Sequence, residues 1–192
     1  KRIIYSSSGG TVYGDIGKIP ATEESLTNPK SSYGIIKLAI EKYLAVYKNL
    51  YGLEYVIARL ANPYGRTTNG SKKQGAVDIF LKQAFDDEPI QISGDGGVVR
   101  DYLYNNDVVD FFIKAIQDPM LNGVYNVGTG VGNSLRKIVD YIEKISNKRP
   151  EVQFQPKKTQ DVDYIVLNIN RARATGWEPK YNLESGIKKI HS

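Results

Sequence analysis

Tyr33 and Lys37 are the residues whose types and spacing most directly suggest chemistry. They stand four positions apart in the segment YGIIK, so on a helix both side chains lie on one face, one turn apart. A free phenol has a pKa of about 10 and is a poor base at neutral pH, but a nearby ammonium favours the phenolate. Lowering a phenol pKa to about 7 corresponds to about 4 kcal/mol. The pair therefore suggests a tyrosine base, although a lone Y-x-x-x-K is more often a surface cation beside a tyrosine.

Two other polar segments follow expected strands. SSSGGTVYG (residues 6–14) comes after a short apolar run, and NPYG (residues 62–65) ends the buried-strand pattern EYVIARL. Catalytic groups in open α/β sheets gather at the carboxyl ends of strands, whereas serine-rich turn chemistry is the plainer interpretation. The joint occurrence of S-S-x-x-x-V-Y-G, P-x-S-x-Y-x-x-x-K and R-x-x-N-P-Y-G is hard to obtain by chance.

The elements that must position these residues alternate between strand and helix, which indicates an α/β fold. Gly52 stops the longest helix and Ser134 caps a later one. We expect strands at 2–6, 54–60, 90–93, 123–127 and 151–155, and helices at 33–51, 76–85, 106–117, 134–146, 170–175 and 183–190.

The composition excludes several kinds of site. The 192 residues contain no cysteine, and His191 is the only histidine, so a thiolate or histidine metal site and a Ser-His-Asp triad are excluded. The net charge of +5 is spread along the chain among acidic residues, which favours a solvated surface over a nucleic-acid groove. No apolar run approaches membrane-spanning length and no signal peptide is visible, so we expect a cytoplasmic protein that binds neither nucleic acid nor membrane.

The helix expected at 33–51 is apolar on more than one face. A single core-facing stripe needs only three or four apolar positions per two turns, and this helix has more. We therefore expect burial on two sides, either against a second subunit in a homodimer or as a central helix within one chain.

Six segments together resemble the extended short-chain dehydrogenase/reductase family, in particular its NAD-dependent sugar-nucleotide epimerases, with the UDP-glucose 4-epimerases as the nearest branch. They are SSSGGTVYGD, NPKSSYGIIK, RLANPYGR, ISGDGGVVRDYLYNNDVVD, GVYNVGTGVGNSL and ATGWEPKYNL. The resemblance implies the C-terminal part of a Rossmann-like doubly wound parallel sheet plus a small α/β substrate-binding lobe. Residues 1–65 and 107–130 would form the NAD-binding part, and residues 66–106 and 131–192 the sugar-nucleotide-binding lobe.

The resemblance also implies roles for the first group of residues. Tyr33 would be the catalytic base, and Lys37 would bind the nicotinamide ribose and tune Tyr33. The catalytic Ser or Thr of the family falls on Gly9 here, so Ser8, or failing that Thr11, would supply the hydroxyl that binds the 4-hydroxyl of the sugar. The residues expected to contact NAD are Ser6, Ser7, Tyr33, Lys37 and Ala61.

A second group would hold the UDP-sugar. Arg100 matches the family's diphosphate-binding arginine, a fork suited to phosphate oxygens, and Lys158 stands where a second arginine is usual. Ile165 falls where members limited to glucose and galactose place a bulky aromatic residue, so an N-acetyl group would fit. The full expected set is Asn62, Gln91, Ser93, Arg100, Lys158, Asp161 and Ile165.

The implied reaction is epimerisation at C4 of a UDP-hexose through a 4-keto intermediate. A 4,6-dehydratase would carry an Asp-Glu pair just before V-Y-G, where this chain has Gly10 and Thr11. A decarboxylase, a reductase and a non-catalytic sugar-nucleotide-binding fragment remain as alternatives.

The first prediction concerns the cofactor. The G-x-x-G-x-x-G turn that seats the NAD pyrophosphate in the family does not occur in these 192 residues, so we expect a longer parent protein in which that turn precedes this chain. We predict that the 192-residue chain alone binds NAD weakly or not at all, as measured by isothermal titration. Micromolar or tighter affinity would contradict it.

Overall fold

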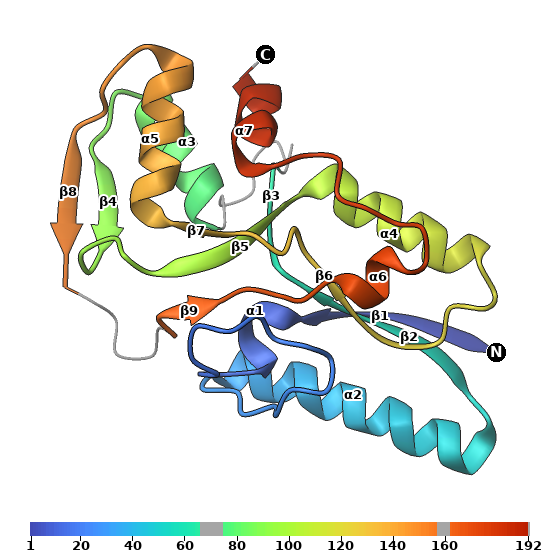
Figure 1. Ribbon diagram of the computed structural model, residues 1–192. Coiled ribbons are helices and arrows are strands. Elements are labelled where there is room, and N and C mark those ends of the chain that lie inside the picture. The colour runs from blue at the N-terminus through green and yellow to red at the C-terminus, as the bar shows by residue number, and fades with distance from the viewer. Residues whose placement is uncertain (66–74, 157–161, 192) are drawn as a thin grey trace.

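The computed structural model describes residues 1–65, 75–156 and 162–191 (Figure 1). Within these ranges the strands are β1 (Arg2–Ser8), β2 (Glu54–Leu60), β3 (Asn62–Tyr64), β4 (Ile90–Ser93), β5 (Val99–Tyr104), β6 (Gly123–Val127), β7 (Gly132–Ser134), β8 (Val152–Gln155) and β9 (Tyr164–Ile165). The helices are α1 (Gly9–Val12), α2 (Ser32–Tyr51), α3 (Ala76–Phe85), α4 (Asn105–Gln117), α5 (Leu135–Ser146), α6 (Asn170–Arg173) and α7 (Leu183–His191). The α/β fold class is confirmed.

A parallel sheet in the order β1-β2-β6 forms the first layer. β2 is buried along most of its length, as its continuous apolar pattern predicts. The register aligns Ser8 with Leu60 and Leu60 with Val127, so all three strands end at the same edge. Residues that follow these strands are therefore brought together whatever their separation in the sequence.

Helix α2 runs along this sheet (Figure 1) and ends before Gly52, as expected, while Ser31 caps its start. The Ser31 hydroxyl accepts a hydrogen bond from the Gly34 amide at 3.1 Å. Gly52 adopts the left-handed conformation at φ 65°, and its amide donates to the Lys48 carbonyl. These two caps fix the helical register of Tyr33 and Lys37.

The sequence predicts that α2 is buried on two sides, but in the structure its outward face is exposed. Five apolar residues at helical spacing are between 38% and 66% exposed: Ile36, Ile40, Tyr43, Tyr47 and Leu50. The interpretation of α2 as a helix buried on both sides within this chain is therefore wrong for the ranges that the structure describes. The second face is free to meet another surface.

Strand β5 links the remaining layers and was not expected from the sequence. It pairs with β3 and β9 in parallel and with β7 in the antiparallel sense. The β4–β8 pair lies beyond it with α3 and α5, at the upper left of Figure 1 and away from α2. Asn62–Tyr64, expected only to end the preceding strand, form a short strand of their own, β3, which contains a proline.

Two hydrophobic clusters form the core. One packs α4 against the β1-β2-β6 sheet and includes Phe111, Val127 and Trp177. The other joins α3, α5 and α7 around β4, with Phe80 and Ile138 at its centre. The segment from Ile165 to Trp177 packs in the first cluster although we assigned it to the lobe; the division into two domains stays a prediction. No helix in the described ranges is both long and apolar enough to cross a membrane.

Candidate active site

Lys37 joins helix α2 to the end of β1. Its ammonium nitrogen donates to the Ser6 carbonyl oxygen at 2.8 Å. The same nitrogen lies 5.6 Å from the centre of the Tyr33 ring and 5.1 Å from that of Tyr5. Tyr33 itself is 55% exposed. The structure thus places an ammonium beside an accessible phenol, as the i, i+4 spacing predicts.

The three serines at the end of β1 have different surroundings. Ser6 offers its carbonyl to Lys37, whereas Ser7 is 3% exposed and its hydroxyl donates to the Glu41 carboxylate. Ser8 is half-buried at the last position of β1 and begins the short helix α1. Because the Ser7 hydroxyl is buried and already bound to Glu41, only the backbone of Ser7 could contact a cofactor.

By the resemblance, Gly9 falls at the position expected to carry a catalytic Ser or Thr. A Cβ atom built on Gly9 would lie 2.7 Å from Leu167 Cδ1 and 3.0 Å from the Arg59 carbonyl oxygen. A serine or threonine side chain would fit there only if Leu167 moved, and the candidate hydroxyls stay those of Ser8 and Thr11. The Thr11 hydroxyl is buried and finds no hydrogen-bond partner in the described part of the chain. Ser8 is half-buried, and the choice between Ser8 and Thr11 stays a prediction.

The ends of β2 and β6 add the next expected residues. The Ala61 amide donates to the Val127 carbonyl at 2.8 Å, which holds this buried residue at the shared edge of the sheet. A Cβ atom on Gly10 would lie 2.8 Å from Asn62 Oδ1, so the absence of a side chain lets the Ser8 turn approach Asn62. The structure therefore brings Ala61 and Asn62 to the same edge as Ser8.

Sequence reasoning missed a buried polar network behind this edge. Glu41 and Arg59 are 4% and 5% exposed, and Arg59 Nη2 donates to Glu41 Oε2 at 2.6 Å. Arg59 Nη1 donates to the Tyr13 hydroxyl at 2.9 Å, and Tyr13 donates to Asn126 Oδ1 at 2.6 Å. A glutamate four residues after Lys37, on the face that meets the sheet, was the signal available in the sequence.

The charges in this network hold definite protonation states. Burial by itself acts to lower the pKa of Arg59, but its hydrogen bonds and charge interactions with Glu41 and Tyr13 together outweigh burial and raise that pKa. Burial raises the pKa of the Tyr13 phenol, and the Arg59 guanidinium acts against this. Arg59 is therefore a cation, and Tyr13 is a neutral hydroxyl that donates to Asn126.

Arg100 lies on the unexpected strand β5. It is half-buried and faces Ile165 of β9 in the parallel register. Ile165 is 2% exposed and packs in the first hydrophobic cluster. The structure thus brings these two expected residues together, while the role of Ile165 beside a sugar stays a prediction.

Asp101, next to Arg100, was also missed by sequence reasoning. Its carboxylate accepts from the Thr129 hydroxyl at 2.6 Å and from the amides of Thr129 and Gly130 at 2.9 and 3.0 Å. Burial raises the pKa of the Asp101 carboxyl, and these hydrogen bonds act against it. Asp101 therefore ties the loop after β6 to β5 and fixes the strand that carries Arg100.

The other expected substrate residues lie apart from α2. Gln91, on β4, is exposed and its side-chain amide bonds to those of Gln153 and Gln155 on β8. The Ser93 hydroxyl donates to the Pro156 carbonyl at 3.4 Å. Lys158 and Asp161 lie outside the described residues. No group of three metal-binding side chains occurs in the ranges that the structure describes.

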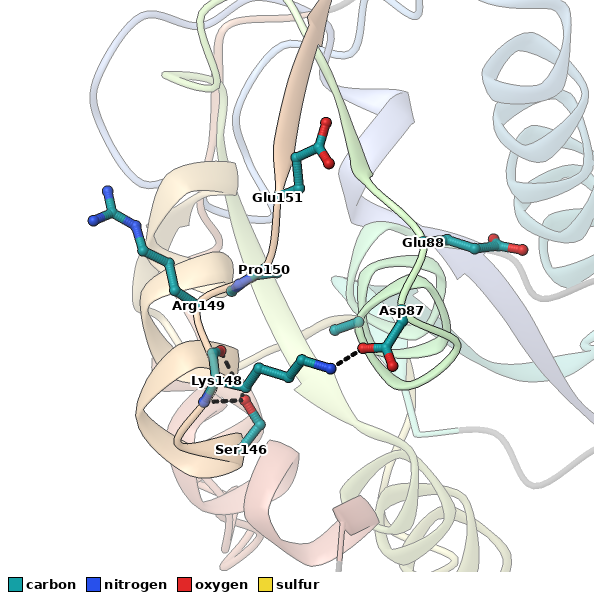
Figure 2. A pocket seen from close by; sticks show the side chains of 8 residues that line it. Asp87, Glu88, Ser146, Lys148, Arg149, Pro150 and Glu151 are labelled. Carbon is teal, nitrogen blue, oxygen red and sulfur yellow. Dashed lines mark hydrogen bonds and ion pairs between the residues drawn. The ribbon is translucent and has the colours of Figure 1, made fainter.

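Figure 2 shows a pocket between α3 and α5 that is separate from this site. Two of its charged side chains, Lys148 and Asp87, form an ion pair across it. The residues that line it are Ala84, Asp87, Glu88, Ser146, Lys148, Arg149, Pro150 and Glu151. None of the residues expected to do chemistry is among them, so the candidate site stays at the edge formed by β1, β2 and α2.

Comparisons with known proteins show the family to which the chain belongs. The family described as "NAD dependent epimerase/dehydratase family" matches residues 1–128. A putative UDP-glucose 4-epimerase of Methanocaldococcus jannaschii is 34% identical over 189 residues, which are 98% of this chain and 61% of that protein. A dTDP-4-dehydro-6-deoxyglucose reductase of Escherichia coli is 36% identical over 192 residues, which are 99% of this chain and 60% of that protein.

A solved structure is similar over the whole chain. The UDP-glucose 4-epimerase of Thermotoga maritima, determined with UDP-glucose, superposes with a TM-score of 0.93 at 35% identity. The match covers 100% of this chain and 62% of that structure. This chain therefore spans about three-fifths of the length of the proteins it matches.

The second prediction ranks the three hydroxyl side chains in the full-length protein, meaning this chain with any residues that precede or follow it. Tyr33→Phe should lower turnover most, Ser8→Ala next and Thr11→Ala least, because the loss of an acid–base group typically costs about 10²–10⁴-fold. Steady-state kinetics of the three variants measure the order. Full activity in Ser8→Ala together with loss in Thr11→Ala would show that Thr11 supplies the hydroxyl.

Proposed function

Because the chain belongs to the NAD-dependent epimerase/dehydratase family, we propose that its full-length protein inverts the configuration at C4 of a UDP-hexose. UDP-glucose and UDP-galactose are the proposed pair of substrates. The observation that carries the proposal is the Lys37 ammonium, held by the Ser6 carbonyl beside the exposed Tyr33 ring. A base so placed at the carboxyl end of a strand suits proton transfer to and from a bound sugar hydroxyl.

The residues present at this edge fit NAD. An ammonium has three N–H donors and Ser6 uses one of those of Lys37, so two remain for the hydroxyls of a nicotinamide ribose. Ala61 would contact the nicotinamide through its backbone. NAD, when bound, supplies the hydride acceptor and is regenerated in each cycle, so no net oxidation occurs.

The proton chemistry belongs to the protein. The Tyr33 phenolate takes the proton of the 4-hydroxyl as C4 is oxidised, and the Lys37 cation stabilises that phenolate. Ser8 binds the same hydroxyl and orients it. After the 4-keto sugar has turned over in the pocket, Tyr33 returns the proton when C4 is reduced on its other face.

The substrate's nucleotide part would be held on the β5 side of the site. Arg100 is half-buried on β5, a strand that Asp101 holds in place. A guanidinium held in this way suits the binding of two diphosphate oxygens in one orientation. Asn62, Gln91, Ser93, Lys158 and Asp161 complete the proposed set. Ile165 would limit the space beside C2 of the sugar.

A reductase is the second candidate, favoured by the 36% identity to the Escherichia coli enzyme. Its reaction consumes one reduced nicotinamide per product, whereas an epimerase consumes none. Incubation of the full-length protein with UDP-galactose, with product analysis and absorbance at 340 nm, separates them. UDP-glucose formed without net nicotinamide change supports the epimerase.

The third prediction concerns the sugars accepted. We predict that UDP-N-acetylglucosamine is a usable substrate and that Ile165→Tyr lowers kcat/KM for it more than for UDP-glucose. A pocket-size effect is worth about 1–3 kcal/mol per small group, or about 5- to 200-fold. Ile165→Leu, which nearly conserves volume, is the control. Equal losses for both sugars would mean that Ile165 acts only in the core, and no N-acetyl activity in the native protein would refute the proposed gate.

The exposed stripe of α2 is proposed as the interface of a homodimer. Large contiguous apolar surfaces on soluble proteins mark interaction sites, and this stripe repeats at intervals of three and four residues. Two copies of the same helix would bury the stripe on both.

The fourth prediction tests this interface. Tyr47→Glu places a charge at the middle of the stripe and should convert the full-length dimer to monomer in light-scattering chromatography. Lys42→Glu adds the same charge type at an exposed position outside the stripe and should leave the dimer intact. A Tyr47→Glu protein that elutes as the native species would exclude this face as the interface.

A further inference from the structure

Lys37 and Glu41 stand four residues apart on α2, where opposite charges ordinarily pair. In the structure they do not pair. Lys37 donates to the Ser6 carbonyl and forms no ion pair within the described ranges, while Glu41 binds Arg59. Something must keep the carboxylate of Glu41 from the ammonium one turn away.

Arg59 is placed to do this. It lies on β2 directly opposite Ser7 of β1, so its side chain meets α2 from the sheet. Its Nε atom lies 3.1 Å from both Glu41 oxygens, and Nη2 lies 2.6 Å from Oε2. Ser7 adds a further hydrogen bond to Oε1. A guanidinium is a rigid planar fork, so the carboxylate is held in one orientation.

The far end of Arg59 is equally fixed. Nη1 donates to the Tyr13 hydroxyl at 2.9 Å and to the Glu23 carbonyl at 3.2 Å. Tyr13 in turn donates to Asn126 Oδ1. The Asn126 side chain is itself fixed, because its Nδ2 donates to the Ala21 carbonyl at 2.8 Å. Arg59 therefore cannot swing away from Glu41 without breaking its hydrogen bonds to Tyr13 and Glu23 as well.

We propose that Arg59 is a positioning residue that neutralises and orients Glu41, so that the Lys37 ammonium remains available to Tyr33. The inference rests on the proposed roles of Tyr33 and Lys37. The charged and titratable groups around Lys37 are Tyr5 on β1, Tyr33 and Glu41 on α2 and, behind Glu41, Arg59 on β2 and Tyr13 after α1. Glu41 is the only anion among these groups. Without Arg59, the cation available to Glu41 is Lys37, one turn away on the same helix.

The sign of the expected effect follows from this rearrangement. When Glu41 pairs with Lys37, the positive charge near Tyr33 is offset and the phenolate is less favoured. The acidic limb of the pH profile of kcat/KM should then move to higher pH by about one pH unit, the low end of the effect of a nearby charge. At neutral pH this lowers kcat, while KM for the sugar nucleotide changes little.

The test uses the full-length protein with NAD bound and compares two variants. Arg59→Met leaves Glu41 charged and should move the acidic limb upward. Glu41→Gln combined with Arg59→Met removes both charges, keeps an acceptor for Ser7, and should return the limb to its native position. Arg171→Met breaks an exposed ion pair with Glu24 and is the matched control that should not move it.

The outcomes separate positioning from mere structural support. A folded Arg59→Met protein with an unmoved limb, or a double variant shifted as far as Arg59→Met, would overturn the proposal. If Arg59→Met is not recovered in folded form, Arg59→Gln, neutral but able to donate to Glu41, should show the same upward shift, and an unmoved limb there would also overturn it.

A second readout does not depend on turnover. Tyrosinate absorbance near 295 nm, taken as the difference between each protein and its Tyr33→Phe counterpart, should appear at higher pH in Arg59→Met than in the native protein. This measurement reports on the phenol even if UDP-hexoses are not the substrates. A native protein without epimerase activity whose tyrosinate signal still shifts in Arg59→Met would refute the proposed function alone, and an active native protein with an unshifted signal in Arg59→Met would refute the inference alone.

Discussion

The parallel pairing of β1, β2 and β6 is the constraint on which the site depends. The register forces Ser8, Leu60 and Val127 to end level with one another. The residues proposed to touch the cofactor lie in the last residues of β1, directly after β2, or on α2, which packs against the sheet. A shift of one residue in the β1–β2 pairing would turn Ser7 away from Glu41 and would separate Arg59 from its partners, because successive side chains point to opposite faces of a strand.

The Glu41–Arg59 pair makes that register costly to change. Taking two charges out of water carries a desolvation penalty of several kcal/mol per ion, which only good geometry and further hydrogen bonds offset. Here both partners are almost fully buried, and each has hydrogen bonds beyond the pair, to Ser7 and to Tyr13. A slipped strand or a rotated helix would leave one buried charge unpaired. The pair therefore selects one arrangement of α2 on the sheet more than it adds to overall stability.

Much of this architecture was predictable from the sequence, and the failures have physical causes. Helix α2 was predictable from its stop at Gly52, and the shared face of Tyr33 and Lys37 from their spacing of four residues. Strand β2 was predictable from its continuous apolar run. All of these signals are local in the sequence. Strand β5 was missed because Arg100 and Asp101 interrupt its apolar pattern, and Asp101 is buried only because distant amides of Thr129 and Gly130 satisfy it. Strand β3 was not expected because proline rarely lies inside strands, so NPYG was interpreted only as the end of β2.

The same distinction between local and distant information explains what was predictable about the site. Tyr33 and Lys37 are four residues apart and share one helix, so spacing alone places them together. The occupied hydroxyl of Ser7 depends on Glu41, 34 residues away, and the exclusion of a side chain at Gly9 depends on Leu167. Leu167 also donates its amide to Asp101 at 3.4 Å, next to Arg100. The residue that closes the space at Gly9 is thus bound to the strand proposed to hold the diphosphate. A shift of β5 would therefore reach the Ser8 turn through Leu167, and the hydroxyl at Ser8 and the fork at Arg100 are held in one packed unit.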